Sequence, residues 1–596
     1  MEVVQEWKEY LAGIAYNDAL VLGDKTYYEM IDSNLAFASG DQWRNVKAVG
    51  ISKPMIPVIQ KARQHTIANL TSTDISASIN PMEYTAKEEE RTPEQQQMVD
   101  TTKIANAEIR NLFDEFKYEF LVREGLGDAF DMGDMCLHFY WDAKAKPFKG
   151  QQYADFRGKI CCELVDAPNV MFGNPNNANP QKQPYILVIG RDLASKLEKE
   201  AKEYKKNVTV ETDTDWTYQA GDNGKVELDT DKYGKALYVI KYYRDDNGNI
   251  KATKFVQNAY IYKDIDLGLT VYPVAWMNYK KQKNQYHGRA EVTGMIPNQI
   301  AINKLLAMVI YSAMNNAFPT RFYNADRMAK LTNEIGKDIA VRNLQPGERV
   351  NDLFAYGEVS QPASIVVQII ELIIDYTKDM MGINDAAVGN VTPENTSAIA
   401  LAEKLTSVPL ENVRSNLYEF TEQVVDICLD FMGAKYGIRP IKVKEGDNTS
   451  IQMFDFSVMK DLNVSKTIDV GAIGYASELS SLKELKDLLN IGAITVVDYL
   501  KRLPENQVPN RDELVKEISF RMGILSEEEQ KQKNAQFEQM AAFVDSLPPE
   551  TQAQLKALPD AEQEQAIMEM MKQAPQQQTE QVNNNLNQAL GGIVQQ

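Results

Sequence analysis

The stretch that decides the fold is residues 294–320, GMIPNQIAINKLLAMVIYSAMNNAFPT, which carries one charged side chain, Lys304. Its apolar residues spread around most of a helix circumference, which predicts a helix covered by its own chain or by neighbouring copies. A second apolar helix is predicted at 363–380, directly after Pro362, a residue that suits a first helical turn. The segment between them contains short β candidates at 338–342 and 349–356. We therefore expect a hairpin of helices that carries a small β module.

Neither helix is expected to cross a membrane, because a span needs about 20 consecutive apolar residues. Pro297, Asn298 and Lys304 interrupt the first helix, and Glu371 and Asp375 interrupt the second. Two buried helices of a large monomeric core would show the same local pattern. The order of the features on either side is what decides between these interpretations.

The composition limits the possible class of protein only broadly. A chain of 596 residues predicts several domains, and its content of 44% apolar and 25% charged residues is typical of a soluble protein. Four cysteines without metal-ligand spacing indicate reduced thiols and a reducing cytoplasm, and the N-terminus has no secretory pattern. The net charge of −20 argues against tight duplex binding, but it is compatible with a channel that surrounds DNA without gripping it.

Several short motifs precede the first apolar helix. Gly40-Asp41-Gln42-Trp43 predicts a turn with Trp43 as an anchor, and 166–175 (DAPNVMFGNP) follows a predicted strand. Tyr286-His287-Gly288 leads into the helix. We expect a helical N-terminus that ends at Gly40 and a helical region at 86–131. Strands are expected at 75–81, 135–141, 159–165, 185–190, 237–243 and 251–262.

Motifs that would indicate chemistry are missing from the sequence. His287 stands beside Gly288 with no nucleophile or carboxylate motif, so we interpret it as a loop histidine. The Asp245–Asn249 cluster has neither the spacing nor the terminal glutamate of a calcium loop. There is no Walker A spacing, His-Glu-x-x-His or nucleophile elbow. We therefore predict no enzymatic activity, no catalytic residues, no cofactor and no metal.

A flexible and then helical region follows the second apolar helix. Residues 382–396 are rich in Gly, Asn and Thr, which predicts a mobile loop. The next helix, 397–436, contains Pro409, and an interior proline kinks a helix. Strands are expected at 440–471 and helices at 477–545, and the Gln-rich composition of 546–596 predicts a mostly disordered tail.

The order of these features, from about Gly40 to Leu525, resembles the portal (head-tail connector) proteins of tailed double-stranded DNA bacteriophages. The resemblance implies an α+β portal fold that forms rings. Its parts would be an α/β wing (1–293 and 437–476), two stem helices (294–318 and 361–381), a small β-containing clip (319–360), a tunnel loop (382–396), a long kinked helix (397–436) and a helical crown (477–545). Ala398 stands where portals often have a glycine.

The resemblance also implies a function. A homo-dodecameric ring would occupy a unique capsid vertex of the virion, after assembly in the host bacterial cytoplasm. Double-stranded DNA would pass through the ring during packaging and ejection, without sequence specificity. The implied partners are the terminase large subunit, the major capsid and scaffolding proteins, and the head-completion or tail adaptor proteins.

On this interpretation three groups of residues are candidates. The DNA tunnel would be lined by Lys304, Asn384, Asn390, Thr392 and Asn395, and the clip would contact partners through Arg321, Arg327, Arg342, Glu348 and Arg349. Trp43, Gly288 and Pro409 would have structural roles.

Two other classes of protein stay open. One is another virion component, such as a capsid or scaffolding protein, although the internal helix–insert–helix hairpin argues against it. The other is a hydrolase or metal-dependent nucleic-acid enzyme whose carboxylates meet only in the folded chain.

Overall fold

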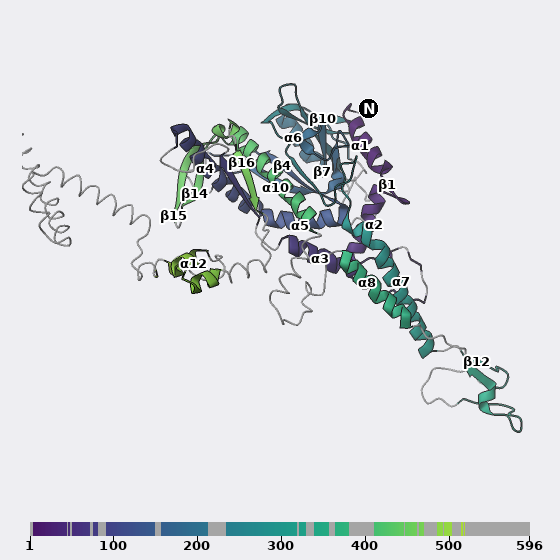
Figure 1. The fold of residues 1–596 in the computed structure, drawn as a ribbon. Coiled ribbons are helices and arrows are strands. Elements are labelled where there is room, and N and C mark those ends of the chain that lie inside the picture. The colour runs from purple at the N-terminus through teal and green to yellow at the C-terminus, as the bar shows by residue number, and fades with distance from the viewer. Residues whose placement is uncertain are drawn as a thin grey trace, which may run out of the picture. The chain divides into compact units, whose positions relative to one another are not determined.

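The computed structural model describes residues 4–502, 514–515 and 518, apart from 45, 48–49, 72–74, 82–90, 149–155, 213–233, 319–320, 329–338, 357–363, 381–409, 446–447, 462–463, 470–484 and 493. The chain divides into two compact units, Met1–Ser477 and Glu478–Gln596. In the described residues the fold is mixed α+β, as the sequence predicts. Figure 1 shows its helices and strands.

The N-terminal segment consists of two helices joined by a tight hairpin. Helix α1 (Trp7–Ala19) is followed by β1 (Val21–Leu22), β2 (Lys25–Thr26) and α2 (Tyr27–Ser39). Thr26 and Glu29 form a capping box that starts α2, and Gly40 ends it in a left-handed conformation (φ 97°). The predicted helix end at Gly40 is confirmed, and the hairpin within the predicted helical segment is a correction.

The helical region predicted at 86–131 is two helices in the described part. Helix α4 (Pro93–Phe116) ends at Lys117, whose φ of 53° is left-handed, and α5 (Tyr118–Met132) begins directly after it. A left-handed residue breaks the α-helical hydrogen-bond pattern, so the chain changes direction there. Ahead of both lies α3 (Val58–Leu70).

Two antiparallel sheets form the centre of the larger unit. The first has the order β11-β4-β5 (Val274–Asn278, Asp134–Asp142 and Lys159–Val165). The second has the order β10-β9-β8-β7-β6 (Ala259–Leu269, Ile250–Val256, Lys235–Arg244, Tyr185–Leu193 and Val170–Phe172), with α6 (Ala194–Glu203) packed on it. The single strand predicted at 251–262 is two strands, because the chain turns at Gln257–Asn258 and β10 pairs back onto β9.

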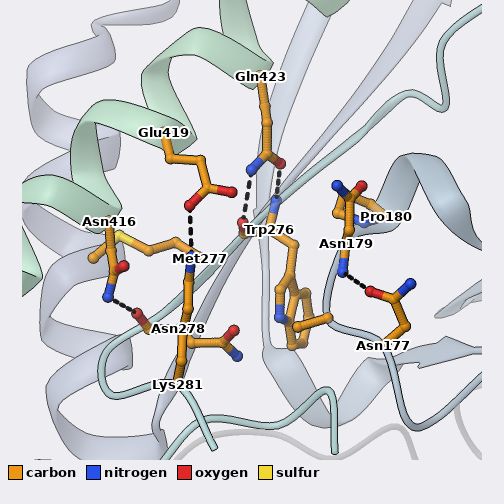
Figure 2. A pocket seen from close by; sticks show the side chains of 11 residues that line it. Asn177, Asn179, Pro180, Trp276, Met277, Asn278, Lys281, Asn416, Glu419 and Gln423 are labelled. Atoms are coloured by element: carbon orange, nitrogen blue, oxygen red, sulfur yellow. Dashed lines mark hydrogen bonds and ion pairs between the residues drawn. The ribbon is translucent and has the colours of Figure 1, made fainter. Parts of the chain in front are cut away.

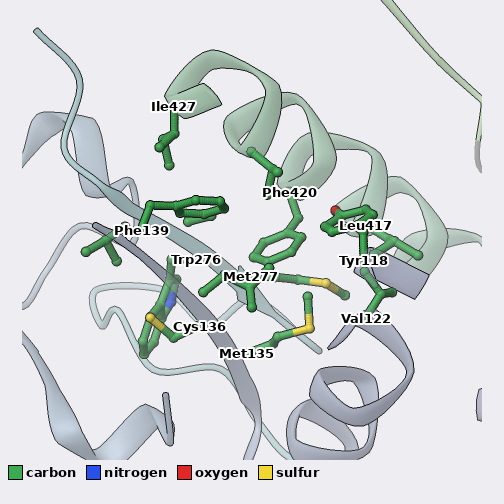
Figure 3. Close-up of a cluster of buried hydrophobic side chains, with 14 of the residues drawn as sticks. Tyr118, Val122, Met135, Cys136, Phe139, Trp276, Met277, Leu417, Phe420 and Ile427 are labelled. Carbon is green, nitrogen blue, oxygen red and sulfur yellow. The ribbon is translucent and has the colours of Figure 1, made fainter. Parts of the chain in front are cut away.

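A long helix closes the core over the smaller sheet. Helix α10 (Glu411–Phe431) continues into a π-helical turn (Met432–Tyr436). Figure 3 shows Leu417, Phe420 and Ile427 of α10 facing the sheet residues Phe139 and Met277. Full burial of a side chain of this size stabilises the fold by about 1.5–3 kcal/mol. This packing holds α10 on the strand that precedes the first apolar helix.

Strands that follow α10 return to the N-terminal part of the chain. β14 (Ile438–Glu445) and β15 (Asn448–Asp455) form a hairpin, followed by a 3₁₀ segment (Phe456–Asp461). β16 (Val464–Asp469) then pairs antiparallel with β3 (Ser76–Pro81). The prediction that strands in 440–471 rejoin the N-terminal region is confirmed by this pairing.

The helix–insert–helix segment consists of α7 (Glu291–Ala317), β12 (Arg321–Tyr323), a 3₁₀ turn (Val350–Leu353), β13 (Phe354–Tyr356) and α8 (Ser364–Met380). Both predicted helices are confirmed, and they lie side by side (Figure 1). Of the two predicted β candidates, 349–356 contains the strand β13, whereas the described part of 338–342 forms no strand. β13 pairs with β12, and Val341 makes only an isolated bridge to Met328. The backbone N–H of Arg349 donates to Asp352, which curls 350–353 into a turn.

The second unit is described only in part. It contains α12 (Val496–Arg502), whose Val497 and Leu500 form a small apolar cluster with Val515. Most of the predicted helical segment 477–545 and all of the predicted tail 546–596 lie outside the described residues.

Candidate functional site

The two apolar helices form an antiparallel hairpin whose base is embedded in the larger unit. Asn298, near the start of α7, donates a hydrogen bond to Thr377, near the end of α8 (3.0 Å). The first half of α7 is buried, including Val292, Met295 and Ile302. Helices α2, α3 and α5 contact this half. Few charged residues occur in this half of α7, because a charged side chain covered by the surrounding helices would lose its contact with water.

A buried polar tether joins α7 to the segment that contains Trp43. Asn303 Nδ2 donates to Gln42 Oε1 (2.7 Å), and Gln299 Nε2 donates to the Ile56 carbonyl (2.8 Å) and to Asn303 Oδ1 (3.0 Å). The three amide side chains are 93% or more buried, so each needs these partners. The segment with the Gly40–Trp43 motif and the first apolar helix thus contact each other.

Trp43 is a half-buried anchor beside that tether. Its indole N–H donates to the Pro54 carbonyl (2.8 Å), which ties the turn after α2 to the segment entering α3. A donor-only indole nitrogen that leaves water needs such an acceptor.

His287 has a carboxylate partner that the sequence did not indicate. Its Nδ1 lies 2.8 Å from Asp134 Oδ2, and its Nε2 lies 3.1 Å from Asn17 Oδ1. Tyr27 stacks on the imidazole at 4.2 Å between ring centroids. His287 and Asp134 are 2% and 0% exposed, so no substrate reaches them. The pair holds the loop that leads into α7, and a general-base role is not supported.

Gly288 occupies a position where no side chain fits. A Cβ there would lie 2.6 Å from the Gly133 carbonyl oxygen and 2.9 Å from Asp134 Oδ1. Its backbone N–H donates to Asp134 Oδ1 at 2.6 Å. The Tyr-x-Gly motif therefore reflects a close approach of two backbone segments.

Helix α8 has a buried stripe and an exposed apolar stripe. The buried stripe includes Ile370 and Thr377. The other follows spacings of four, three and four residues and is exposed: Ile365 58%, Ile369 38%, Leu372 49% and Tyr376 59%. This spacing is that of a helix seam made for a second helix. The described part of a single chain leaves this seam uncovered.

The distal half of α7 is exposed as well. Met308, Tyr311 and Met314 are 63%, 47% and 49% exposed. Lys304 lies one turn before Met308 and is also exposed, and no acidic side chain among the described residues pairs with it.

The five residues predicted for the clip differ in burial and pairing. Arg327 Nη1 bonds to both carboxylate oxygens of Glu348 (2.7 and 2.8 Å), and both side chains are half-buried, so this pair holds the insert together. Arg342 and Arg349 are exposed, and Arg321 is half-buried in β12. The other predicted site residues, Asn384, Asn390, Thr392, Asn395 and Pro409, lie outside the described part of the chain.

A polar crevice of ≈ 220 Å³ lies where α10 crosses the edge strand β11. Figure 2 shows Gln423 of α10 bonding both the N–H (3.0 Å) and the carbonyl (3.3 Å) of Trp276, as a neighbouring strand would. Asn416 donates to the carbonyl of Asn278 (3.1 Å). These amides satisfy a sheet edge that would otherwise be open. Sequence reasoning missed them, although Asn416 and Gln423 are seven residues apart and so share one helix face.

The described residues offer little for catalysis. No three His, Cys, Asp or Glu side chains among them gather as a metal site. Burial raises the pKa of the Cys136 and Cys428 thiols, which keeps them protonated and poorly nucleophilic. Among the described helices, none combines the length and the apolar character needed to span a bilayer.

Two carboxyl groups on α5 share one guanidinium. Arg63 Nε lies 2.8 Å from Asp131 Oδ2. Burial raises the pKa of Asp128 to about 7, and the negative charges of Asp166, Asp131 and Glu124 add to this. Burial likewise raises the pKa of Asp131 to about 6, against the opposing effect of Arg63. The folded state therefore holds Asp128 protonated at pH values where the unfolded chain has released the proton.

This gives a pH-dependent prediction. When the pKa of a carboxyl group is higher in the folded state than in the unfolded state, the free energy of unfolding falls as the pH rises from about 4 to about 7. Above about pH 7 the free energy stays lowered by the full amount. Asp128→Asn removes the penalty, so we expect it to raise the free energy of unfolding at pH 8 by on the order of 1–3 kcal/mol, seen as a higher thermal midpoint, and to have little effect at pH 4.5. Thermal scans at both pH values check this, with the exposed loop variant Asp246→Asn as control. An equal effect of Asp128→Asn at both pH values would contradict the assignment.

No protein-family model matches the chain, and no curated protein matches it.

Proposed function

We propose that this chain is the portal protein of a tailed double-stranded DNA bacteriophage and forms a closed dodecameric ring at a unique capsid vertex. The observation that carries the proposal is the exposed seam of α8. The buried stripe of the same helix is already covered by its own chain, whereas the described residues leave the seam uncovered. The seam consists of Ile365, Ile369, Leu372 and Tyr376. Exposed apolar stripes of this kind mark protein interfaces. When one copy covers the next by a head-to-tail contact that closes on itself, the product is a ring.

The proposed ring serves as the channel for DNA packaging and ejection. In it, Lys304 and the loop residues Asn384, Asn390, Thr392 and Asn395 face the duplex and contact phosphates weakly. Phosphate contacts carry no sequence information, so the DNA can move past them in either direction. The net charge of −20 supports this mode, since a mostly acidic protein does not hold DNA tightly.

The β insert is the proposed docking site for successive partners. Its exposed Arg342 and Arg349, mixed with acidic residues, suit a hydrated interface that can be exchanged. The terminase large subunit would bind there and hydrolyse ATP during packaging, and head-completion or tail adaptor proteins would replace it. The major capsid and scaffolding proteins would contact the ring at the virion vertex, and assembly would take place in the host bacterial cytoplasm.

Negative-stain electron microscopy of the purified full-length chain tests the proposal. We expect rings whose end-on averages show a central hole wide enough for B-form DNA, and these averages also count the subunits. Compact monomers at micromolar concentration, both alone and with capsid and scaffolding proteins, would overturn it.

A further inference from the structure

A groove at the base of the helical hairpin is a second unfilled surface. It has a volume of ≈ 250 Å³ and lies between the start of α3, α7 and α8. Its lining is mostly apolar and includes Ile56, Met295 and Ile374. Two lysines, Lys61 and Lys378, line it as well. The groove has room for one or two large side chains, too little for a whole helix.

The groove and the exposed seam of α8 lie on opposite faces of the same helix. At about 100° per residue, Leu372 and Tyr376 point roughly 180° away from Ile374 of the groove. Exposed carboxylates run beside the seam at Glu371, Asp375 and Asp379. One face of α8 therefore presents apolar side chains with acids, and the other borders an apolar groove with lysines.

We propose that Leu372 and Tyr376 of one copy insert into the groove of the next copy, with Glu371 and Asp375 placed near its lysines. This inference rests on the proposed ring and names its contact. A two-fold dimer cannot fill both surfaces. When the seam of one copy contacts the groove of the other, the groove of the first copy and the seam of the second point away from the contact and stay open. The contact is heterologous, and its repetition adds copies until a ring closes.

The charged groups set the orientation of this contact. Lys61 is exposed. Lys378 lies 3.4 Å from Asp375 of its own helix, an exposed i,i+3 pair of the kind that stabilises little. Lys61 can bond a carboxylate of the neighbouring copy at small cost, and Lys378 adds positive charge beside it. Complementary charges of this kind favour one docking direction, and salt weakens them.

Two full-length variants with complementary defects test the contact. The groove variant is Lys61→Glu with Lys378→Glu, and the seam variant is Leu372→Asp with Tyr376→Asp. We expect each alone to associate at least about tenfold more weakly than the wild-type chain. Mixed in equal amounts, they should form one-to-one dimers that do not grow, because one intact seam meets one intact groove. Lys199→Glu, on the exposed face of α6, is the control and should form rings.

Mass photometry and light scattering distinguish the outcomes. Wild-type rings together with a groove variant that assembles like Lys199→Glu would overturn the contact and leave the ring standing. Two defective variants that stay monomeric when mixed would also overturn it. A wild-type chain that remains monomeric would remove the proposed function first, and the contact with it.

Discussion

Ile369→Lys combined with Leu372→Lys should leave the purified chain monomeric. Both side chains lie on the exposed seam of α8, so the folded monomer tolerates the lysines. In a ring the same lysines would be buried against a neighbouring copy without partners. Size-exclusion chromatography with light scattering, followed by negative-stain imaging, measures the result.

The expected effect is large because every subunit contact loses the same two anchors. Full burial of an Ile or Leu side chain contributes about 1.5–3 kcal/mol. Ile369 and Leu372 are 38% and 49% exposed in the monomer, so burying the remainder contributes about 1–3 kcal/mol per contact. Since 1.4 kcal/mol is a factor of ten, association should weaken by roughly 10–100-fold, and the buried lysine charges weaken it further. Asp246→Lys is the matched control, because Asp246 is exposed in a turn outside α8 and the substitution changes the net charge by the same two units. Rings from the double variant, or monomers from the control, would contradict the interpretation.

Local patterns in the sequence predict the elements of this fold well where one physical signal dominates. The low charge of 294–320 predicts a helix, and α7 forms over Glu291–Ala317, with the buried residues in its first two thirds. The strand predicted at 159–165 is also present, as β5 over Lys159–Val165. The break at Lys117 has no such signal, because lysine rarely adopts a left-handed conformation and only the surrounding packing requires it here.

The candidate site was less predictable, because it consists of contacts between distant segments. Gln42 belongs to the Gly40–Trp43 motif and Asn303 to the first apolar helix, but nothing local in the sequence indicates that their amides meet across 261 positions. Likewise, Asp134 stands at the start of a strand, and its pairing with His287 arises only when β4 and β11 lie together. The composition does indicate the exposed seam of α8, because a helix so apolar needs more cover than one neighbouring helix provides.

Asp134→Ala should be the most destabilising single substitution in the larger unit. Its carboxylate accepts hydrogen bonds from His287 Nδ1 (2.8 Å), Asn278 Nδ2 (2.6 Å) and the Gly288 backbone N–H (2.6 Å). All three donors belong to buried residues, where water cannot replace the lost acceptor. The truncation removes the acceptor of the Gly288 N–H, while Asn278 Nδ2 keeps the Tyr286 carbonyl (2.7 Å) and His287 Nδ1 keeps the Tyr27 hydroxyl (3.0 Å). Loss of one member of such a buried polar pair costs about 3–5 kcal/mol. Urea unfolding followed by fluorescence measures the loss, and Asp246→Ala, in an exposed loop, should cost almost nothing.

The location of the destabilised residues shows whether Asp134 anchors this loop or stabilises the core in general. The loop that Asp134 holds runs directly into Ala290, the residue that caps the start of α7. Hydrogen exchange should therefore rise first in residues 286–296, while amides of the five-stranded sheet stay protected. His287→Gln should cost less than Asp134→Ala, and the double variant should cost less than the sum, because the two side chains stabilise the same loop. Strict additivity, or uniform loss of protection, would show that the pair does not anchor the helix. The expected result would show that the buried Asp134–His287 pair orients the α7–α8 hairpin. This pair is separate from the α8 seam through which copies are proposed to meet.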